Sequence, residues 1–267
     1  MFVKKRIIFL FCVCSITSAS LFGQEIPQKT MTGRDVAILV DKVPDGDDRT
    51  AELSFMLINK QGKKRVRQVK SYQKDIGEDT KSVMCFVSPS DVKNTIFLQH
   101  DYDDPSKEDD KWLYLPALKK VRRIAGSSKN DYFMGTDFTY DDMGDRNVDE
   151  DDHKLLEDET IEGYDCWVKE ARPKDKDYMY SRVVSWIRKD IHIPIKMDFY
   201  DRHENLMKSM KLSDFRQTEG FWKAFKLEME NYQQKHRTII EYQKVKYNTG
   251  LNDNLFEVSA IEKGRIR

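Results

Sequence analysis

Most of this chain beyond residue 48 consists of short segments in which apolar and polar residues alternate. In the first of these segments, residues 51–57, an apolar residue holds every odd position. Alternation with a period of two places one set of side chains on one face of a β-strand. Comparable segments recur to about residue 258, and turn sequences such as 59–62 separate many of them. The pattern predicts about ten strands, joined mostly by short turns.

Helical periodicity is confined to two places. Thr32 can cap a helix over residues 33–42, and a shorter helix is expected within residues 134–143. Strands that follow one another with few helices between them favour one antiparallel meander over βαβ units. Because no internal repeat or long linker is evident, residues 24–267 are predicted to form a single, mainly β (α+β) domain.

Residues 1–23 have the composition of a secretory signal peptide. A basic start, 4–6, precedes an apolar run over residues 7–16 and then several small residues. The apolar run is too short to span a membrane stably, so we expect cleavage and export, with an N-terminal membrane anchor as the alternative. The position of cleavage, after Ser20 or Gly23, is left open.

The mature chain is nearly neutral. Removing residues 1–23 leaves 43 basic against 46 acidic residues. The basic residues lie among acidic runs, which argues against nucleic acid as the main partner. Two cysteines remain, Cys85 and Cys166, both in predicted strands. We expect two separate core residues, with a disulfide in an oxidising compartment as the alternative.

Three segments resemble a known family in their order and spacing. Residues 86–95 (FVSPSDVKNT) resemble the segment F-x-x-P-x-D-x-K-G-T of the outer-membrane lipoprotein-sorting proteins, with Asn94 where Gly is usual. Residues 112–124 (WLYLPALKKVRRI) resemble the next segment of that family. Residues 133–143 (FMGTDFTYDDM) resemble its segment F-x-G-S-D-F-S-Y-E-D-L. The chain therefore looks like a member of the longer envelope branch of the LolA/LolB-like superfamily.

This resemblance implies both a fold and a function. The implied fold is a strongly curved antiparallel sheet that forms an incomplete barrel, with a few helices covering or plugging its concave face. The implied function is that of a non-enzymatic periplasmic carrier or chaperone in a Gram-negative-type envelope. It would bind acyl chains of lipoproteins or other lipids in an apolar cavity and transfer them between membranes, without a cofactor. Contact with the membranes would be transient, without a transmembrane span in the mature chain.

Members of this branch are often linked with transporters of the resistance-nodulation-division (RND) type. The alternative function is therefore that of an accessory protein that docks on an inner-membrane RND-type exporter or on an envelope scaffold.

A carrier of acyl chains needs a wide apolar lining, because each buried methylene contributes about 0.8 kcal/mol. In a half-barrel, alternate residues of successive strands supply that lining. The candidates are Leu53, Phe55, Leu57, Val83, Phe97, Trp112, Tyr114, Trp186, Ile195, Met197 and Phe199. The alternative is that these side chains fill an ordinary core.

Residues 133–143 are the candidate lid of the cavity, with Phe133, Phe138 and Met143 as its apolar side chains. Thr139 and Asp142 have nearly the spacing of a capping box, which would begin a short helix and turn Phe138 and Met143 toward the cavity. The alternative is a fixed helix that plugs one end of the barrel.

Basic residues on two segments are candidates for contact with lipid head groups or with an acidic partner. They are Arg65, Arg67, Arg122 and Arg123. The alternative is that they belong to a solvated strand face.

Neither a metal site nor a catalytic motif is predicted. Asp145, Asn147 and Asp149 match the first ligand positions of a calcium loop, but Glu150 and Leu156 stand where Gly and Glu are needed. No HExxH, GxSxG, CxxC or Walker sequence is present. An envelope hydrolase is therefore a distant alternative, and cargo, partners and oligomeric state are left open.

Overall fold

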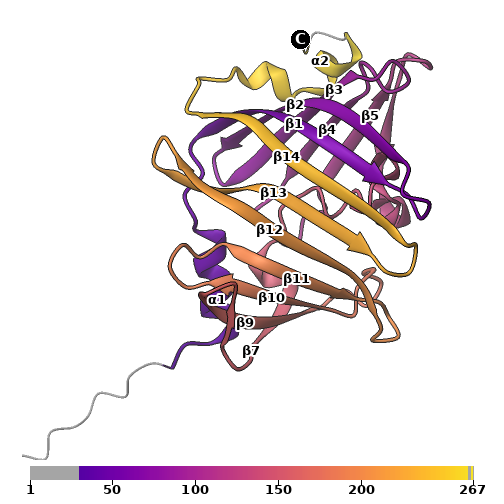
Figure 1. Ribbon diagram of the computed structural model, residues 1–267. Coiled ribbons are helices and arrows are strands. Elements are labelled where there is room, and N and C mark those ends of the chain that lie inside the picture. The colour runs from indigo at the N-terminus through magenta and orange to yellow at the C-terminus, as the bar shows by residue number, and fades with distance from the viewer. Residues whose placement is uncertain (1–29, 264–265, 267) are drawn as a thin grey trace, which may run out of the picture. The chain divides into compact units, whose positions relative to one another are not determined.

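The computed structural model describes residues 30–263 and 266, and residues from Met31 onward form one compact unit. Its main element is a single antiparallel sheet of 14 strands (Figure 1). The strands are β1 (Asp48–Ile58), β2 (Lys64–Ile76), β3 (Asp79–Ser88), β4 (Ile96–Asp101), β5 (Asp110–Leu115), β6 (Lys120–Ile124), β7 (Asp151–Leu155), β8 (Glu159–Ile161), β9 (Tyr164–Pro173), β10 (Arg182–Arg188), β11 (Pro194–Tyr200), β12 (Leu206–Thr218), β13 (Phe221–Asn231) and β14 (His236–Tyr247). The helices are α1 (Gly33–Asp41), η1 (Gly126–Asn130), η2 (Phe133–Gly135), η3 (Val148–Glu150), η4 (Asp253–Phe256) and α2 (Val258–Glu262).

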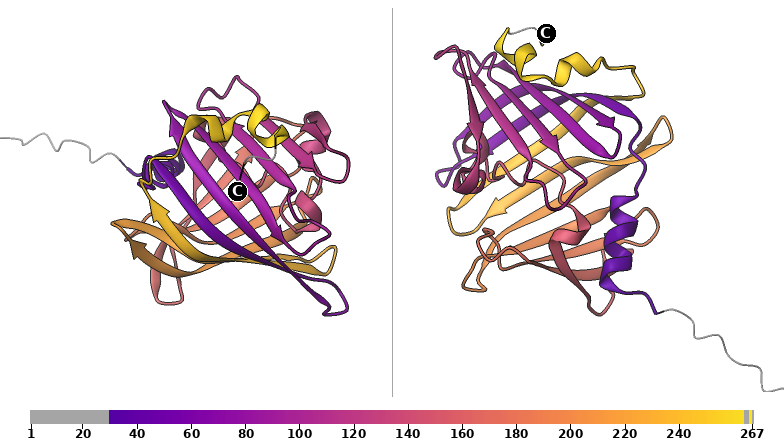
Figure 2. Two further views of the ribbon diagram at one scale, coloured as in Figure 1. Left: turned by 90° about the horizontal axis from the view of Figure 1, so that it is seen from above. Right: turned by 180° about the vertical axis from the view of Figure 1, so that it is seen from behind.

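The sheet consists of two meanders joined at its centre. Its order is β6-β5-β4-β3-β2-β1-β14-β13-β12-β11-β10-β9-β7, with β8 added beside β9. The first and last strands of the chain, β1 and β14, pair with each other, with Phe55 opposite Ile240. Since β6 and β7 each have only one neighbour in this order, the sheet curves but stays open, as predicted (Figure 2).

The local predictions near the start of the domain are confirmed. Thr32 and Asp35 form a capping box at the start of α1. In β1 the odd-numbered residues 51–57 are buried. Asn94, at the position where the family has Gly, has a φ of +65°, in the left-handed region that Asn tolerates better than most residues.

The two faces of the sheet are covered differently. We call the face that contacts residues 126–147 and α1 the inner face, and its core cluster includes Phe55, Phe86, Phe97 and Phe133. The outer face of β3, β4 and β5 packs against the C-terminal segment with η4 and α2, shown in yellow in Figures 1 and 2. The strands β3, β4 and β5 are therefore apolar on both sides.

One prediction about secondary structure is wrong, and three elements were missed. Thr139 and Asp142 exchange the two hydrogen bonds of a capping box, at 2.7 and 3.0 Å, but a turn follows them and no helix. The basic run forms the edge strand β6, which was not predicted. The C-terminal helices η4 and α2 were also missed.

Cys85 and Cys166 are separate, buried, free cysteines, as expected. The predicted signal peptide lies outside the described residues. Across residues 30–263, the structure has no helix that is long and apolar enough to cross a membrane.

Candidate binding cavity

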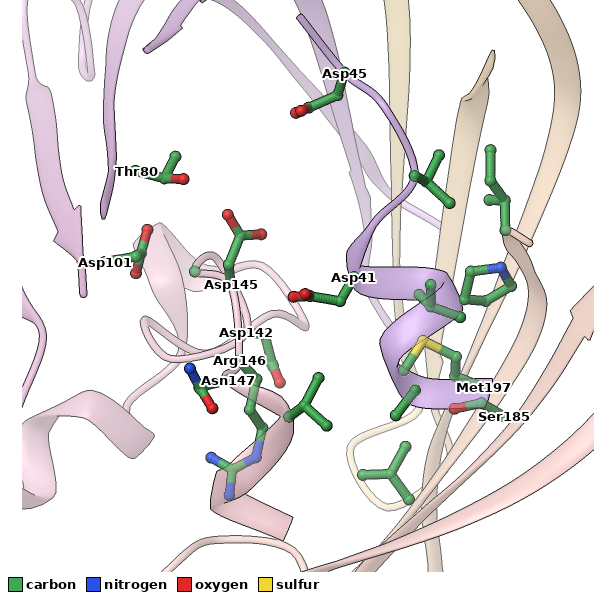
Figure 3. Close-up of a pocket in the computed structure, with 18 of the residues that line it drawn as sticks. Asp41, Asp45, Thr80, Asp101, Asp142, Asp145, Arg146, Asn147, Ser185 and Met197 are labelled. Atoms are coloured by element: carbon green, nitrogen blue, oxygen red, sulfur yellow. The ribbon is translucent and has the colours of Figure 1, made fainter. Parts of the chain in front are cut away.

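A cavity of about 780 Å³ lies between α1, the loop 141–147 and the inner face of β10–β13 (Figure 3). The N-terminal end of α1 packs closely on β7, because a Cβ atom at Gly33 would lie 2.6 Å from the Lys154 backbone. The next turns of the helix then present Ala37 and Val40 to the cavity. Pockets that hold small apolar ligands have volumes in this range.

One wall of the cavity is apolar and comes from four neighbouring strands. Its side chains are Val183, Met197, Phe199, Met210, Leu212, Ala224, Leu227 and Met229. Met side chains are flexible and adapt to ligands of different shape. This wall can therefore pack against apolar groups of different shape.

The facing wall is acidic. Ten Asp and Glu side chains line the cavity against four Arg and Lys side chains. The carboxylates come from α1, the chain that follows it, the end of β2 and the turn after it, the end of β4 and the chain after it, the start of β7 and the loop 141–147. Figure 3 shows Asp41, Asp45, Asp101 and Asp145 around one open space. The cavity thus joins an apolar surface to a region of excess negative charge.

Burial in this region shifts the pKa of several groups. Desolvation and the nearby Asp145 raise the pKa of Asp101 to about 8. Desolvation also raises the pKa of Asp145 itself and that of Asp75. Desolvation lowers the pKa of Lys223, whose ammonium lies 4.2 Å from the Tyr242 ring centroid.

The segment 133–143 forms part of the cavity wall and is tied to the sheet by a buried ion pair. The Lys208 ammonium, fully buried, donates to the Asp142 carboxylate at 2.6 Å and to the Asp137 carbonyl at 3.0 Å. The Tyr180 hydroxyl donates to the same carboxylate at 3.0 Å. Desolvation and Asp142 raise the pKa of Tyr180 well above its usual range, so this hydroxyl keeps its proton.

A second set of contacts holds the same segment at β14 and β2. The Thr238 hydroxyl donates to the Asp137 carboxylate at 2.7 Å, and His236 Nδ1 lies 2.7 Å from the same oxygen. The Arg67 guanidinium donates to the Met134 carbonyl. These contacts hold residues 133–143 against the sheet, and we call this segment the plug.

The plug also lies between a filled half of the inner face, over β3 and β4, and a half that holds the cavity. Phe133 is fully buried, with its ring 5.0 Å from Phe97, 6.0 Å from Phe86 and 5.5 Å from Tyr140, measured between ring centroids. These rings fill the space over β3 and β4. The cavity is left on the other side of the plug, over β10–β13.

The eleven predicted lining residues do not share one surface. Met197 and Phe199 line the cavity, as does Phe138 of the predicted lid. The others on the inner face are Leu53, Phe55, Leu57 and Phe97. They belong to the core cluster beside the plug, which also contains Phe133 and has Met143 packed against it. The remaining five lie in clusters of the outer face: Val83, Trp112 and Tyr114 beneath the C-terminal segment, and Trp186 and Ile195 in a third cluster.

Two local features explain why Trp186 of β10 and Ile195 of β11 do not line the cavity. Lys196 pairs with Trp186 and Pro194 pairs with Ile187, so Ile195 is an extra residue in a β-bulge. The bulge places Ile195 away from Met197, although the two are two residues apart. In β10 the small Ser185 faces the cavity and the bulky Trp186 faces outward.

The four predicted basic residues also separate. Arg67 is buried beneath the plug, where desolvation lowers its pKa, so it is not available to a head group. Arg123 pairs with Asp110 of the neighbouring strand. Arg65 and Arg122 are exposed.

The acidic wall was missed from the sequence. Its members come from separate parts of the chain, and the local signals were the acidic run 101–104 and the spacing of Asp145, Asn147 and Asp149. In the described part of the chain, no three His, Cys, Asp or Glu side chains are grouped to hold a metal ion.

Several known proteins are similar to this chain. A family model described as "Uncharacterized protein" matches residues 78–263. A DUF1329 family protein from Desulfovibrio piger is 35% identical, with a TM-score of 0.83 over 86% of this chain and 97% of its own. A putative outer membrane lipoprotein-sorting protein domain from Vibrio parahaemolyticus is 31% identical, with a TM-score of 0.82 over 86% of this chain and 98% of its own.

A third solved structure is similar in fold. It is a LolA superfamily protein from Nitrosomonas europaea, 17% identical, with a TM-score of 0.68 over 86% of this chain and 99% of its own. No curated protein matches the chain.

Proposed function

The chain belongs to the DUF1329 family of LolA-like lipoprotein-sorting proteins, and from this premise we propose that it is a periplasmic carrier of lipids or lipoprotein acyl chains. The cargo chain would lie in the cavity over β10–β13. Transfer between envelope membranes would follow from reversible occupation of that cavity.

The observation that supports this proposal best is the apolar wall of the cavity. An acyl chain placed against Met197, Phe199 and Met210 would leave water, and each buried methylene contributes about 0.8 kcal/mol. A single long chain therefore supplies a useful affinity without covalent chemistry. Because the sheet is open at β6 and β7, it does not form a closed barrel, and cargo would not have to thread through one.

The direct test is lipid extraction. The mature protein would be purified from envelope extracts without detergent, extracted with organic solvent and examined by mass spectrometry. The proposal predicts a stoichiometric lipid in the wild type and a reduced amount in Met210→Asp, which places a charge on the apolar wall. Met56→Asp is the matched control, because Met56 alternates with the inward residues of β1 and faces the other side of the sheet. Absence of lipid from the wild type would argue against a carrier.

A specific feature also supports the accessory-protein alternative. β6 is an edge strand, and its Lys120 and Arg122 are exposed on it. An exposed strand edge with basic side chains can receive an acidic segment of a membrane partner. Arg122→Glu with Lys120→Glu should abolish co-purification with such a partner and leave lipid content unchanged. Lys176→Glu, on an exposed turn, is the control.

A further inference from the structure

The charges on the cavity wall are unbalanced even after ion pairs are counted. Arg49, Arg146 and the buried Lys111 and Lys208 neutralise part of the acidic wall. Five carboxylates of the wall have no ion pair within the described part of the chain: Asp41, Asp75, Glu78, Asp103 and Asp145. Excess negative charge that lines a partly desolvated space attracts a cation more strongly than it would in open water.

Asp101 shows that this wall also lacks a hydrogen-bond donor. Its side chain is only 7% exposed, and its Oδ2 accepts from the Gln99 amide. Its Oδ1 has no hydrogen-bond partner, and the nearest cation, the Lys111 ammonium, lies 3.9 Å away. Asp101 is at the cavity surface, on the opposite side of Asp145 from α1 (Figure 3). Buried polar atoms are rarely left without a partner. The pKa of about 8 means that Asp101 keeps a proton at neutral pH, because the nearby Lys111 does not offset the desolvation of this carboxyl.

The raised pKa values of Asp75, Asp101 and Asp145 have the same physical origin. Each carboxylate is disfavoured in its charged form because it is desolvated beside other carboxylates. A positive charge that entered this space would relieve that repulsion. The nearby groups that would respond are the carboxylates Asp45, Asp75 and Asp145 and the cations Arg49 and Lys223.

We infer that the cavity selects amphiphiles that carry one ammonium head group on an apolar chain. The chain would lie against Met197, Met210 and Leu227, and the ammonium would lie among Asp145 and Asp101. A metal ion is a poorer occupant, because no metal-holding group of side chains exists among residues 30–263 and the apolar wall would stay unused. This selectivity rests on the proposed carrier function, since the apolar chain occupies the same wall.

The test compares amphiphiles of equal chain length on the mature protein. Calorimetric titration would use dodecylammonium, dodecyl maltoside and dodecanoate, each below its micelle concentration. We expect dodecylammonium to bind roughly tenfold tighter than the maltoside, the size of one charge-assisted hydrogen bond, and dodecanoate to bind weakest. A lyso-phosphatidylethanolamine arm distinguishes an aminolipid head group, which also carries a phosphate, from a simple ammonium.

Asp145→Asn is the informative variant, because Asp145 is accessible within the cavity and needs no refolding of the core. It should reduce the preference for ammonium over maltoside severalfold and leave maltoside binding unchanged. Asp152→Asn removes one charge on exposed β7 outside the cavity and should change neither.

The outcomes separate the two proposals. Equal binding of all three head groups would overturn the ammonium selectivity and leave the carrier function standing. Absence of binding by every amphiphile would overturn both. A preference for ammonium that survives in Asp145→Asn and in Asp101→Asn would overturn the assignment of the head group to this wall.

Discussion

The ammonium of Lys208 lies 2.6 Å from the carboxylate of Asp142, and the two side chains join β12 to the plug across the inner face of the sheet. Neither group is more than 7% exposed. The pair therefore fixes the segment that separates the filled half of the inner face from the cavity.

Lys208→Met should destabilise the protein by about 3 kcal/mol. The substitution leaves the Asp142 carboxylate and the Asp137 carbonyl without their donor, and breaking a buried ion pair has a cost of this size. Chemical denaturation measures the loss. Lys211→Met is the control, since its pair with Glu162 is exposed and should contribute less than about 1 kcal/mol. Equal effects of the two substitutions would show that the Lys208 pair does not hold the plug.

Asp101→Asn should make the stability of the protein less dependent on pH. Because the pKa of Asp101 is raised to about 8, the folded state keeps a proton that the unfolded state releases near pH 4. Stability from this group therefore falls as pH rises from about 4 to about 8. The free energy of unfolding of wild type and variant would be measured at about pH 5 and at about pH 8. Relative to the wild type, the variant should be more stable at pH 8 than it is at pH 5. A parallel decline in both proteins would contradict this assignment.

Asp48→Asn should loosen the C-terminal segment from β1. The Asp48 carboxylate accepts from the Thr249 hydroxyl and from the backbone N–H groups of Thr249, Gly250 and Leu251, at 2.7 to 2.9 Å. Substitution by an amide replaces an acceptor with a donor and should cost about 2 kcal/mol. Hydrogen exchange would locate the loss in the segment 249–262, and full protection there would count against this role.

The same carboxylate predicts a contribution to acid unfolding. Burial alone would raise the pKa of Asp48, but the hydrogen bonds from Thr249, Leu251 and Gly250 outweigh it and lower the pKa. The stabilisation is therefore present above the unfolded pKa, near 4, and is lost as pH falls below it. The difference in stability between wild type and Asp48→Asn should shrink on acidification. A constant difference down to about pH 2 would be incompatible with an ionised Asp48.

The positions of the strands could be predicted from the sequence better than the direction of their side chains. In β1 the alternation is clear, and the inward set was correct. In β3 and β5 both faces are apolar, because the C-terminal segment covers the outer one, so Val83 and Trp112 gave no sign of facing away from the cavity. In β11 a single extra residue, Ile195, changes the face.

The cavity itself depends on contacts that are remote in sequence. Asp41 lies in α1, Asp101 at the end of β4 and Asp145 in the loop 141–147, and only the folded chain brings them to one wall. The plug illustrates the same point. The exchange of hydrogen bonds between Thr139 and Asp142 could be read from the sequence, but no helix follows it. The further bonds of Asp142 to Lys208 and Tyr180 depend on strands that are remote in sequence.

The central claim is that apolar cargo occupies the wall formed by β10–β13. Methyl NMR of protein labelled at its methionine methyl groups tests it most directly, because Met197, Met210 and Met229 line the cavity and Met56 faces the other side of β1. On titration with a single-chain amphiphile, the account predicts saturable shifts of the three cavity methyl signals and an unchanged Met56 signal. Unchanged cavity signals, or shifts at Met56 alone, would contradict it.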